Sequence, residues 1–379
     1  MVTETVLKNA RIVLPDEVVE GAIKIVDGNI VDIASGPTET GKDMEGDYLT
    51  PGLVELHTDH LEGHYAPRPK VRWNPIAAVQ AHDAQIAASG ITTVFDALRI
   101  GFDEEAQTGI EDMRKLSSAI AEGREAGRLR ADHFLHLRCE VSAPDCQSAF
   151  ERFGNHPLVR LVSLMDHAPG QRQFTDIETY KLYYMRKLKV SEEEFRLYCE
   201  KRMQQSQQYS TPTRKAIAAA CRERGVILAS HDDATAEHVA EASAQGIRVA
   251  EFPTTHLAAK ASKESGLSVL MGAPNIVRGG SHSGNVSARE LAEAGYLDII
   301  SSDYIPASMM QSAFFLSDVA EEISLPQAIR FVSANPAKAV GFEDRGEIVT
   351  GKRADLVRVQ VADHVPIIRT VWREGRRVI

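Results

Sequence analysis

Five hydrophobic, strand-like runs of this chain end in side chains that bind metal ions or move protons. The runs end in Leu56-His57-Thr58-Asp59, Arg138-Cys139-Glu140, Met165-Asp166-His167, Ser230-His231-Asp232-Asp233 and Ser301-Ser302-Asp303. Side chains at i and i+2 of a strand point to the same side, so His57 and Asp59 can reach one point. The carboxyl ends of parallel barrel strands form one mouth, where active sites of that fold are built. The series therefore predicts a parallel barrel whose strand ends converge on a metal site.

Strand-like and helix-like segments alternate through the middle of the chain, which is typical of parallel strands joined by crossover helices. The segments with strand character are Leu53–Thr58, Thr92–Ala97, Phe134–Glu140, Val159–Asp166, Val226–His231, Arg248–Phe252, Ser268–Gly272 and Leu297–Ser302. Helical spacing of apolar residues occurs in Pro75–Ser89, Glu111–Glu125, Arg214–Arg224 and Pro326–Val332. We therefore predict an α/β fold with a (β/α)8 TIM-like barrel at residues 51–344.

Both ends of the chain have a different texture, with short β-like runs, glycine-containing turns and no helical period. We predict that residues 1–50 and 345–379 pair into one small β-sandwich domain beside the barrel. The segment at about 168–214 is too long for an ordinary connection, so it predicts a helical insertion over the barrel mouth. A lid over the site and a packing or subunit-contact element fit this insertion equally well.

Composition excludes several classes of protein. The 379 residues are 43% hydrophobic, enough for a large core. A net charge of -10 argues against general nucleic-acid or anionic-membrane binding. The chain shows neither a secretory leader nor an apolar run of the roughly 18 residues that span a bilayer, so a cytoplasmic protein is expected. Its 4 cysteines lack CxxC spacing and are expected to be reduced.

The strand-end residues are ligands of the kind that borderline divalent metals prefer, namely imidazole nitrogen and carboxylate oxygen. We predict that His57 and Asp59 hold one ion. His167 and His231 hold a second, and Glu140 bridges the two ions through its two oxygens. A lone buried histidine is more often a hydrogen-bonded core residue than a ligand. Ligand types at successive strand ends favour a shared site over unrelated structural histidines.

Other polar residues flank these ligands. Asp303 follows the last predicted strand, and we expect it to bind metal and to accept a proton from the attacking water. His60 and His64 follow the first strand and are expected to support ligands or contact substrate. After His231, we expect Asp232 to cap the next helix rather than to act on the site.

Basic side chains gather in loops that follow predicted strands, where they suit an anionic substrate. Arginine presents paired donors that match phosphate oxygens, and lysine adds a point charge. The loop at 278–285 combines a cation, glycines, hydroxyls and an imidazole, although a glycine-rich loop by itself is also compatible with a tight turn. The predicted substrate-binding residues are Arg68, Lys70, Arg172, Arg278 and His282.

Longer motifs resemble the phosphonate-utilisation branch of the amidohydrolase superfamily, whose members are metal-dependent barrels with a small β domain built from both termini. The motifs lie at 49–59 (Leu-Thr-Pro-Gly-Leu-Val-Glu-Leu-His-Thr-Asp), 67–71, 163–174, 228–235, 250–255 and 271–286. The resemblance covers the whole chain. It implies cleavage of α-D-ribose 1-methylphosphonate 5-triphosphate to the 5-phosphate and diphosphate. It carries metal roles to His57, Asp59, Glu140, His167, His231 and Asp303.

The resemblance implies two divalent metal ions, with zinc, manganese or iron as the candidates. The familiar superfamily motif has histidine where this chain has Asp59, and a harder oxygen ligand shifts preference towards manganese or iron. Superfamily analogy predicts a homodimer. One alternative is an amidohydrolase that acts on a C–N bond of a cyclic amide or base. Another is a catalytically silent barrel that serves as an assembly partner.

Overall fold

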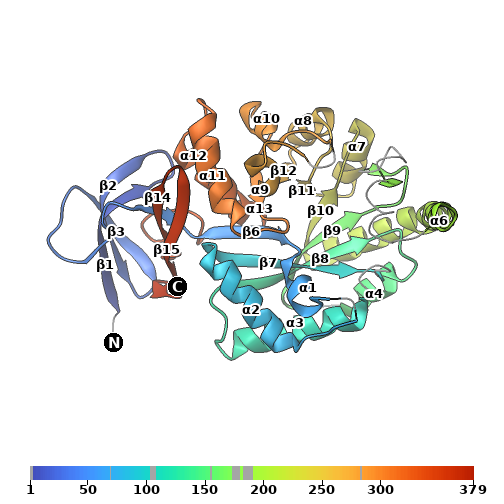
Figure 1. Cartoon of the computed structure of the whole chain (residues 1–379), viewed down its shortest axis with the longest axis horizontal. Coiled ribbons are helices and arrows are strands. Elements are labelled where there is room, and N and C mark those ends of the chain that lie inside the picture. The colour runs from blue at the N-terminus through green and yellow to red at the C-terminus, as the bar shows by residue number, and fades with distance from the viewer. Residues whose placement is uncertain are drawn as a thin grey trace.

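Two sheets organise the chain. The computed structural model describes residues 3–68, 70–102, 108–153, 156–172, 180–181, 191–281 and 284–379. One eight-stranded sheet is parallel and lies in the larger part of the molecule, and a second sheet of eight strands is mixed. Figure 1 shows the mixed sheet to one side of the parallel sheet and its helices, with both termini at the mixed sheet.

The parallel sheet is the predicted barrel. Its strands are β6 (Leu53–Thr58), β7 (Ile91–Ile100), β8 (Asp132–Glu140), β9 (Val159–Met165), β10 (Ile227–His231), β11 (Val249–Glu251), β12 (Ser268–Gly272) and β13 (Ile299–Ser301). They are paired in sequence order, and a parallel bridge between Thr58 and Asp303 links the first strand edge to the last. This confirms the predicted α/β barrel. Apolar side chains such as Val54, Phe95 and Leu161 fill its interior.

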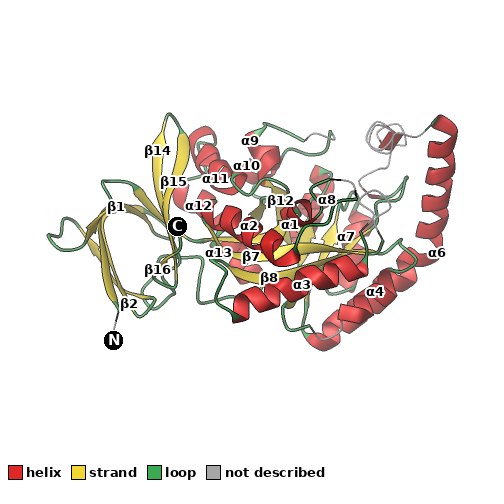
Figure 2. Ribbon diagram, turned by 60° about the horizontal axis from the view of Figure 1, so that its bottom comes forward, coloured by secondary structure: helices red, strands yellow, loops and turns green. Residues whose placement is uncertain are grey.

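Helices cover the outside of the barrel. They are α1 (His60–Tyr65), α2 (Pro75–Ala88), α3 (Ile110–Glu125), α4 (Cys146–Phe153), α6 (Glu192–Arg224), α7 (Ala236–Ala244), α8 (His256–Glu264), α9 (Ala273–Val277), α10 (Ala288–Glu293), α11 (Ser308–Val319), α12 (Leu325–Val332) and α13 (Ala334–Ala339). Their starts follow from local chemistry: the Asn74 side chain caps α2 ahead of Pro75, and Ser324 forms a capping box with Gln327 at α12. Figure 2 shows α6 at the end of the molecule opposite the mixed sheet.

The mixed sheet joins the two ends of the chain. Its strands are β1 (Glu4–Val13), β2 (Val18–Val26), β3 (Asn29–Ser35), β4 (Lys42–Asp43), β5 (Tyr48–Pro51), β14 (Leu356–Ala362), β15 (Val365–Arg373) and β16 (Arg376–Arg377). Strand β5 pairs with β1 on one side and with β14 on the other. Leu7, Ile23, Leu356 and Trp372 share its core, which confirms that both termini build one small β unit. The limits 1–50, 345–379 and 51–344 for two domains stay a prediction.

Helix α6 occupies much of the predicted insertion at 168–214. Ser191 caps it in a capping box with Glu194, and Gly225 ends it in a left-handed conformation (φ 65°). The helix begins far ahead of the predicted start at Arg214 and continues through Pro212. Residues 173–179 and 182–190 of the insertion lie outside the described part of the chain, so the lid role stays a prediction.

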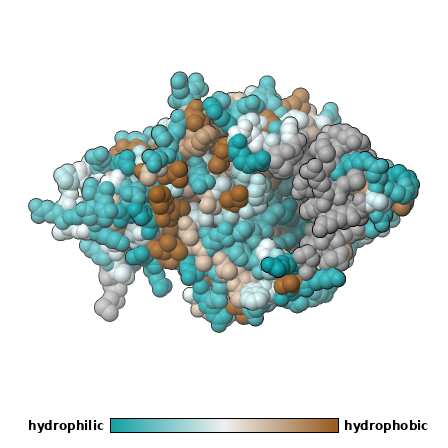
Figure 3. Space-filling model, viewed as in Figure 1, coloured by the Kyte–Doolittle hydropathy of each residue, from teal (hydrophilic) through white to brown (hydrophobic). Residues whose placement is uncertain are grey.

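The surface of the molecule is mostly hydrophilic on the face shown in Figure 3, with apolar atoms gathered near the junction of the mixed sheet and the barrel. Within the described ranges, no helix is both long and apolar enough to cross a membrane. Cys139, Cys146, Cys199 and Cys221 are all buried and form no disulfide bond, and their reduced state in solution stays a prediction.

A buried network of charges ties α2 to β7 and β8. His82 Nε2 lies 2.8 Å from Asp96 Oδ1, and His133 Nδ1 lies 2.8 Å from Asp96 Oδ2. The other ring nitrogen of His133 lies 3.2 Å from Asp83. Burial opposes both charges, but their attraction prevails: it raises the pKa of His133 to about 9 and lowers the pKa of Asp96 to about 2. A charged His133 between two aspartates therefore fastens the helix to the sheet.

We expect Asp96→Asn to destabilise the fold by about 3–5 kcal/mol near pH 6, because it leaves a buried histidinium without its main partner. Because the pKa of His133 is raised above its ordinary value of 6.5, the protonated ring stabilises the fold fully below pH 6.5. This stabilisation is lost as pH rises through about 9. Because the pKa of Asp96 is lowered, its ionised carboxylate also stabilises the fold above pH 3.8, and this stabilisation is lost as pH falls through about 2.

Urea unfolding at about pH 6 and about pH 9.5 measures this effect. The loss of unfolding free energy caused by Asp96→Asn should be smaller at the higher pH. Asp318→Asn, at a half-exposed position, is the control, and equal penalties at both pH values would contradict the network.

Candidate metal centre

The first group of candidate ligands consists of His57, Asp59 and Asp303. One ligand atom from each lies within 4.8 Å of the others. His57 is the penultimate residue of β6, Asp59 precedes α1, and Asp303 follows β13. The Asp303 amide donates to the His57 carbonyl at 3.1 Å, and the Asp59 amide donates to the Asp303 carbonyl at 3.0 Å. The contact that closes the barrel therefore also assembles this group.

A buried carboxylate that the sequence analysis missed supports that closure. Glu55 of β6 accepts from the Ser302 amide at 2.6 Å and from the Ser301 hydroxyl. Both donors belong to the end of β13, so Glu55 fixes the strand that precedes Asp303. An acidic residue within an otherwise apolar strand was the available signal.

The second group consists of His167, His231 and Asp232, again with ligand atoms within 4.8 Å of one another. Asp232 Oδ2 lies 3.6 Å from His167 Nε2 and 3.5 Å from His231 Nε2. Asp232 has a left-handed backbone (φ 57°), which is uncommon for a residue other than glycine and is often found at functional sites. The predicted capping role of Asp232 is wrong, because Thr235 caps α7. The rings of His57 and His231 are stacked at 5.6 Å, so the two groups adjoin.

Two buried carboxylates orient the histidines. Glu251 of β11 lies 3.1 Å from Nδ1 of both His57 and His231, one oxygen to each. Glu140 lies 2.7 Å from Nδ1 of His167. Each ring thereby gives its Nδ1–H to a carboxylate and turns Nε2 towards an aspartate of its group. Metal-binding histidines are typically held this way. The sequence analysis assigned no role to Glu251.

Glu140, predicted to bridge two metals, has other partners in the structure. Its oxygens accept from the Ser142 hydroxyl at 2.7 Å, from the His167 amide at 3.0 Å, and from Arg99 and Arg202 at 3.3 and 3.4 Å. It belongs to neither ligand group among the described residues. These contacts favour an orienting role, and the bridging role stays a prediction.

The two aspartates of the first group have opposite electrostatic environments. Burial opposes ionisation of Asp59, but the nearby Arg138 guanidinium, 2.6 Å away, holds its pKa below the usual range. Burial and the charge of Asp59 raise the pKa of Asp303 to about 7. The difference between the two pKa values indicates that Asp59 stays ionised, whereas Asp303 can exchange a proton near neutral pH. Asp303 is therefore the better candidate for a general base.

The histidines are held strongly by their carboxylate partners. Burial lowers the pKa of His57, but Glu251 outweighs it and raises the value to about 10. Glu140 likewise outweighs burial at His167 and raises its pKa to about 9. Without a cation at the site, protons therefore occupy these rings. A divalent ion is the natural replacement, because metal binding releases ligand protons.

The residues fit a metal ion by an independent test. Oδ1 of Asp59 is buried, and no hydrogen bond to it is found in the described part of the chain. A buried oxygen without a donor is costly unless a cation or water satisfies it. With imidazole nitrogens and carboxylate oxygens around it, the site suits a borderline divalent metal.

The predicted substrate-binding residues differ in their exposure to solvent. Arg68 and Lys70 are exposed in the connection between α1 and α2, and Arg278 is exposed at the end of α9. Lys70 has a left-handed backbone (φ 65°). Exposed cations at these positions are available to an anion. His282 lies outside the described residues.

Arg172 differs from those cations because it is buried, at 6% exposure. It forms an ion pair with Asp233, and its Nη2 lies 3.1 Å from Glu241 Oε2. Its charge is thus offset within the protein. The predicted contact with substrate stays a prediction for this residue.

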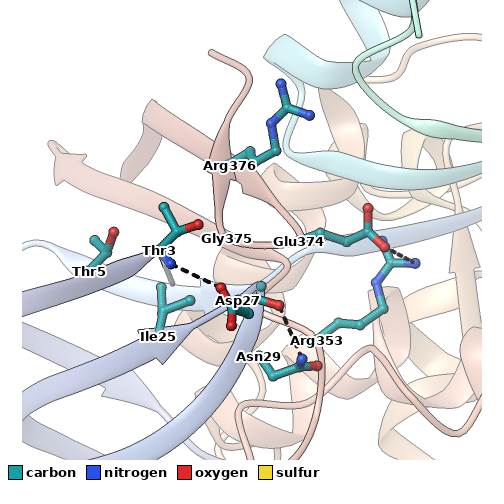
Figure 4. A pocket seen from close by; sticks show the side chains of 10 residues that line it. Thr3, Thr5, Ile25, Asp27, Asn29, Arg353, Glu374, Gly375 and Arg376 are labelled. Atoms are coloured by element: carbon teal, nitrogen blue, oxygen red, sulfur yellow. Dashed lines mark hydrogen bonds and ion pairs between the residues drawn. The ribbon is translucent and has the colours of Figure 1, made fainter. Parts of the chain in front are cut away.

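A pocket of about 380 Å³ lies elsewhere, among β1, β2 and the C-terminal strands (Figure 4). Asp27 accepts from the Thr3 amide at 2.9 Å, and Arg353 lies 3.7 Å from Glu374. None of the candidate ligands lines it. This pocket therefore belongs to the join between the chain ends and not to the metal centre.

Known proteins with a similar sequence or fold agree with this architecture. The chain is 47% identical over 376 residues to alpha-D-ribose 1-methylphosphonate 5-triphosphate diphosphatase of Escherichia coli (strain K12), covering 98% of this chain and 100% of that protein. N-acetyl-D-glucosamine-6-phosphate deacetylase of Mycobacterium smegmatis has a similar fold (TM-score 0.64, 17% identity, 100% of each chain). So does 5-methylcytosine deaminase of Klebsiella pneumoniae (TM-score 0.65, 14% identity, 99% of this chain and 98% of that chain). The pattern of the amidohydrolase family matches residues 84–379, and this chain belongs to that family.

Proposed function

We propose that this protein is a metal-dependent hydrolase that cleaves α-D-ribose 1-methylphosphonate 5-triphosphate to the 5-phosphate and diphosphate in phosphonate utilisation. The 47% identity to the Escherichia coli diphosphatase along nearly the whole chain supports this substrate. The structural observation that most strongly supports a metal-dependent reaction is the pair of adjoining ligand groups at the ends of the barrel strands. Active sites of barrel enzymes lie at that end.

Two divalent ions, with zinc, manganese or iron as candidates, suit the two groups. His57, Asp59 and Asp303 would hold one ion. The other would lie among His167, His231 and Asp232. When bound, such ions supply Lewis acidity towards phosphoryl oxygens and make water more acidic.

Side chains around the metal centre have distinct roles in the proposed reaction. A carboxylate oxygen of Asp303 accepts the proton of the attacking water. Arg138 keeps Asp59 ionised, and Glu251 holds the rings of His57 and His231 in place. His57, His231 and Glu251 are buried, which strengthens the interactions between them.

Phosphorus NMR of the metal-supplemented protein with the ribose triphosphate is the direct test. We expect diphosphate and the 5-phosphate as the products, with no orthophosphate. In water labelled with oxygen-18, the product that gains the label identifies the phosphorus attacked. Release of orthophosphate, or turnover of a cyclic amide instead of the triphosphate in a parallel assay, would refute the proposed function. Protein stripped with a chelator is the matched control and should be inactive.

A further inference from the structure

Three arginines meet beside the candidate metal centre, each from a different element. Arg99 lies in β7, Arg138 in β8 and Arg202 in α6. Arg99 and Arg138 are direct register partners on neighbouring parallel strands. The positive charge of Arg99 repels the positive charges of Arg138 and Arg202. Like charges held side by side on a sheet are destabilising, so this arrangement requires offsetting anions.

Carboxylates of the described residues contribute to that offset. Arg138 Nη1 lies 2.6 Å from Asp59, while Arg99 Nη2 and Arg202 Nη2 share Glu140 at 3.3 and 3.4 Å. Arg99 and Arg202 thus share a carboxylate that also accepts from His167. The carboxylates of Glu62 and Asp303 also favour the charged form of Arg138.

At Arg138 and Arg202, the number of donors also exceeds the acceptors found among the described residues. A guanidinium carries five N–H donors in a planar fork. The buried Nε atoms of Arg138 and Arg202 have no hydrogen-bond acceptor in the described part of the chain. Yet the side chains keep some access to solvent, at 21% for Arg99, 15% for Arg138 and 11% for Arg202. A ligand rich in oxygen acceptors can reach them.

We propose that Arg99, Arg138 and Arg202 form a phosphate subsite that binds the diphosphate part of the polyphosphate. This inference rests on the proposed function and adds the residues that would recognise the leaving group. Arg138 adjoins the group of Asp59, whereas Arg99 and Arg202 adjoin Glu140 and His167, so the cluster flanks both ligand groups. Arginine forks match phosphate oxygens in pairs and offset charge that develops on the departing diphosphate.

A purely structural role predicts a different result. If the arginines only neutralise Glu140 and Asp59, their loss should lower stability and metal content without a specific effect on diphosphate binding. If they form the subsite, diphosphate affinity should fall while the metal stays bound. Binding of inorganic diphosphate therefore separates the two roles.

The test is calorimetric titration of inorganic diphosphate into metal-loaded protein, with metal content and Tm measured on each sample. We expect Arg99→Gln and Arg202→Gln each to raise Kd by about 10- to 100-fold, as the loss of a charged hydrogen-bond donor implies. Arg196→Gln is the control, since Arg196 lies on the same helix but is exposed and paired with Glu193 and Glu200. It should leave Kd unchanged.

Arg202→Lys keeps the experiment decisive if Arg202→Gln loses metal or fails to fold. Lysine keeps the charge but loses the fork, so we expect Kd to rise by about tenfold in a metal-loaded, folded protein. An unchanged Kd in metal-loaded Arg99→Gln and in either Arg202 variant would overturn the subsite. Diphosphate binding is measured without substrate, so its outcome is independent of whether the wild-type protein hydrolyses the triphosphate.

Discussion

Asp303→Asn is expected to lower kcat for the triphosphate by about 100- to 10 000-fold, with a much smaller change in KM, because general-base catalysis contributes on that scale. Asparagine keeps the shape of the side chain and one oxygen that can face a cation. It does not accept a proton near neutral pH. Proton transfer is therefore the contribution that this substitution removes.

Steady-state kinetics with metal analysis of the same samples check this expectation. Asp363→Asn is a suitable control, because Asp363 is exposed in the turn between β14 and β15 and has a left-handed backbone that asparagine tolerates. It should keep wild-type kcat. Undiminished kcat in a metal-loaded Asp303→Asn protein would show that another group accepts the proton.

Glu251→Gln is expected to weaken metal binding by about 10- to 100-fold at one of the two ligand groups, the usual cost of losing the partner that orients a metal-binding histidine. Glu251 offers one oxygen to Nδ1 of His57 and the other to Nδ1 of His231. Glutamine has a single carbonyl oxygen, so its NH2 group must oppose the Nδ1–H of one ring. That ring must turn or change tautomer, which removes its Nε2 from the ligand group.

Titration of the metal-free protein with manganese or zinc measures this effect. Glu264→Gln is the matched control, because Glu264 is an exposed glutamate at the end of α8. Its metal affinity should equal that of the wild type. Full affinity in Glu251→Gln would mean that the histidines are positioned without Glu251 or are not ligands.

The sequence predicts the barrel well because its strands are short apolar runs with sharp ends. The bounds of β6 and β12 match the predicted Leu53–Thr58 and Ser268–Gly272. The N-terminal part of α6 was missed for the opposite reason, since it is polar and contains Pro212, which usually signals a helix end. Its position depends on tertiary contacts that local patterns do not report.

The structure brings five of the predicted ligands together in two groups with Asp232, whereas Glu140 lies in neither group and metal binding by these residues stays a prediction. His57 lies in β6 and Asp59 follows the strand two residues later, so their proximity could be predicted from the local sequence. Glu251 reaches His57 across 194 positions, and that contact depends on the barrel register. Arg172 illustrates the same limit, because its buried pairing with Asp233 and Glu241 follows from tertiary packing.

Anomalous diffraction from crystals grown with manganese tests the central claim most directly. The account predicts two peaks at the mouth of the barrel. One should lie among His57, Asp59 and Asp303 and the other among His167, His231 and Asp232. Manganese bound only elsewhere, or absent from both groups at saturating concentration, would contradict the account.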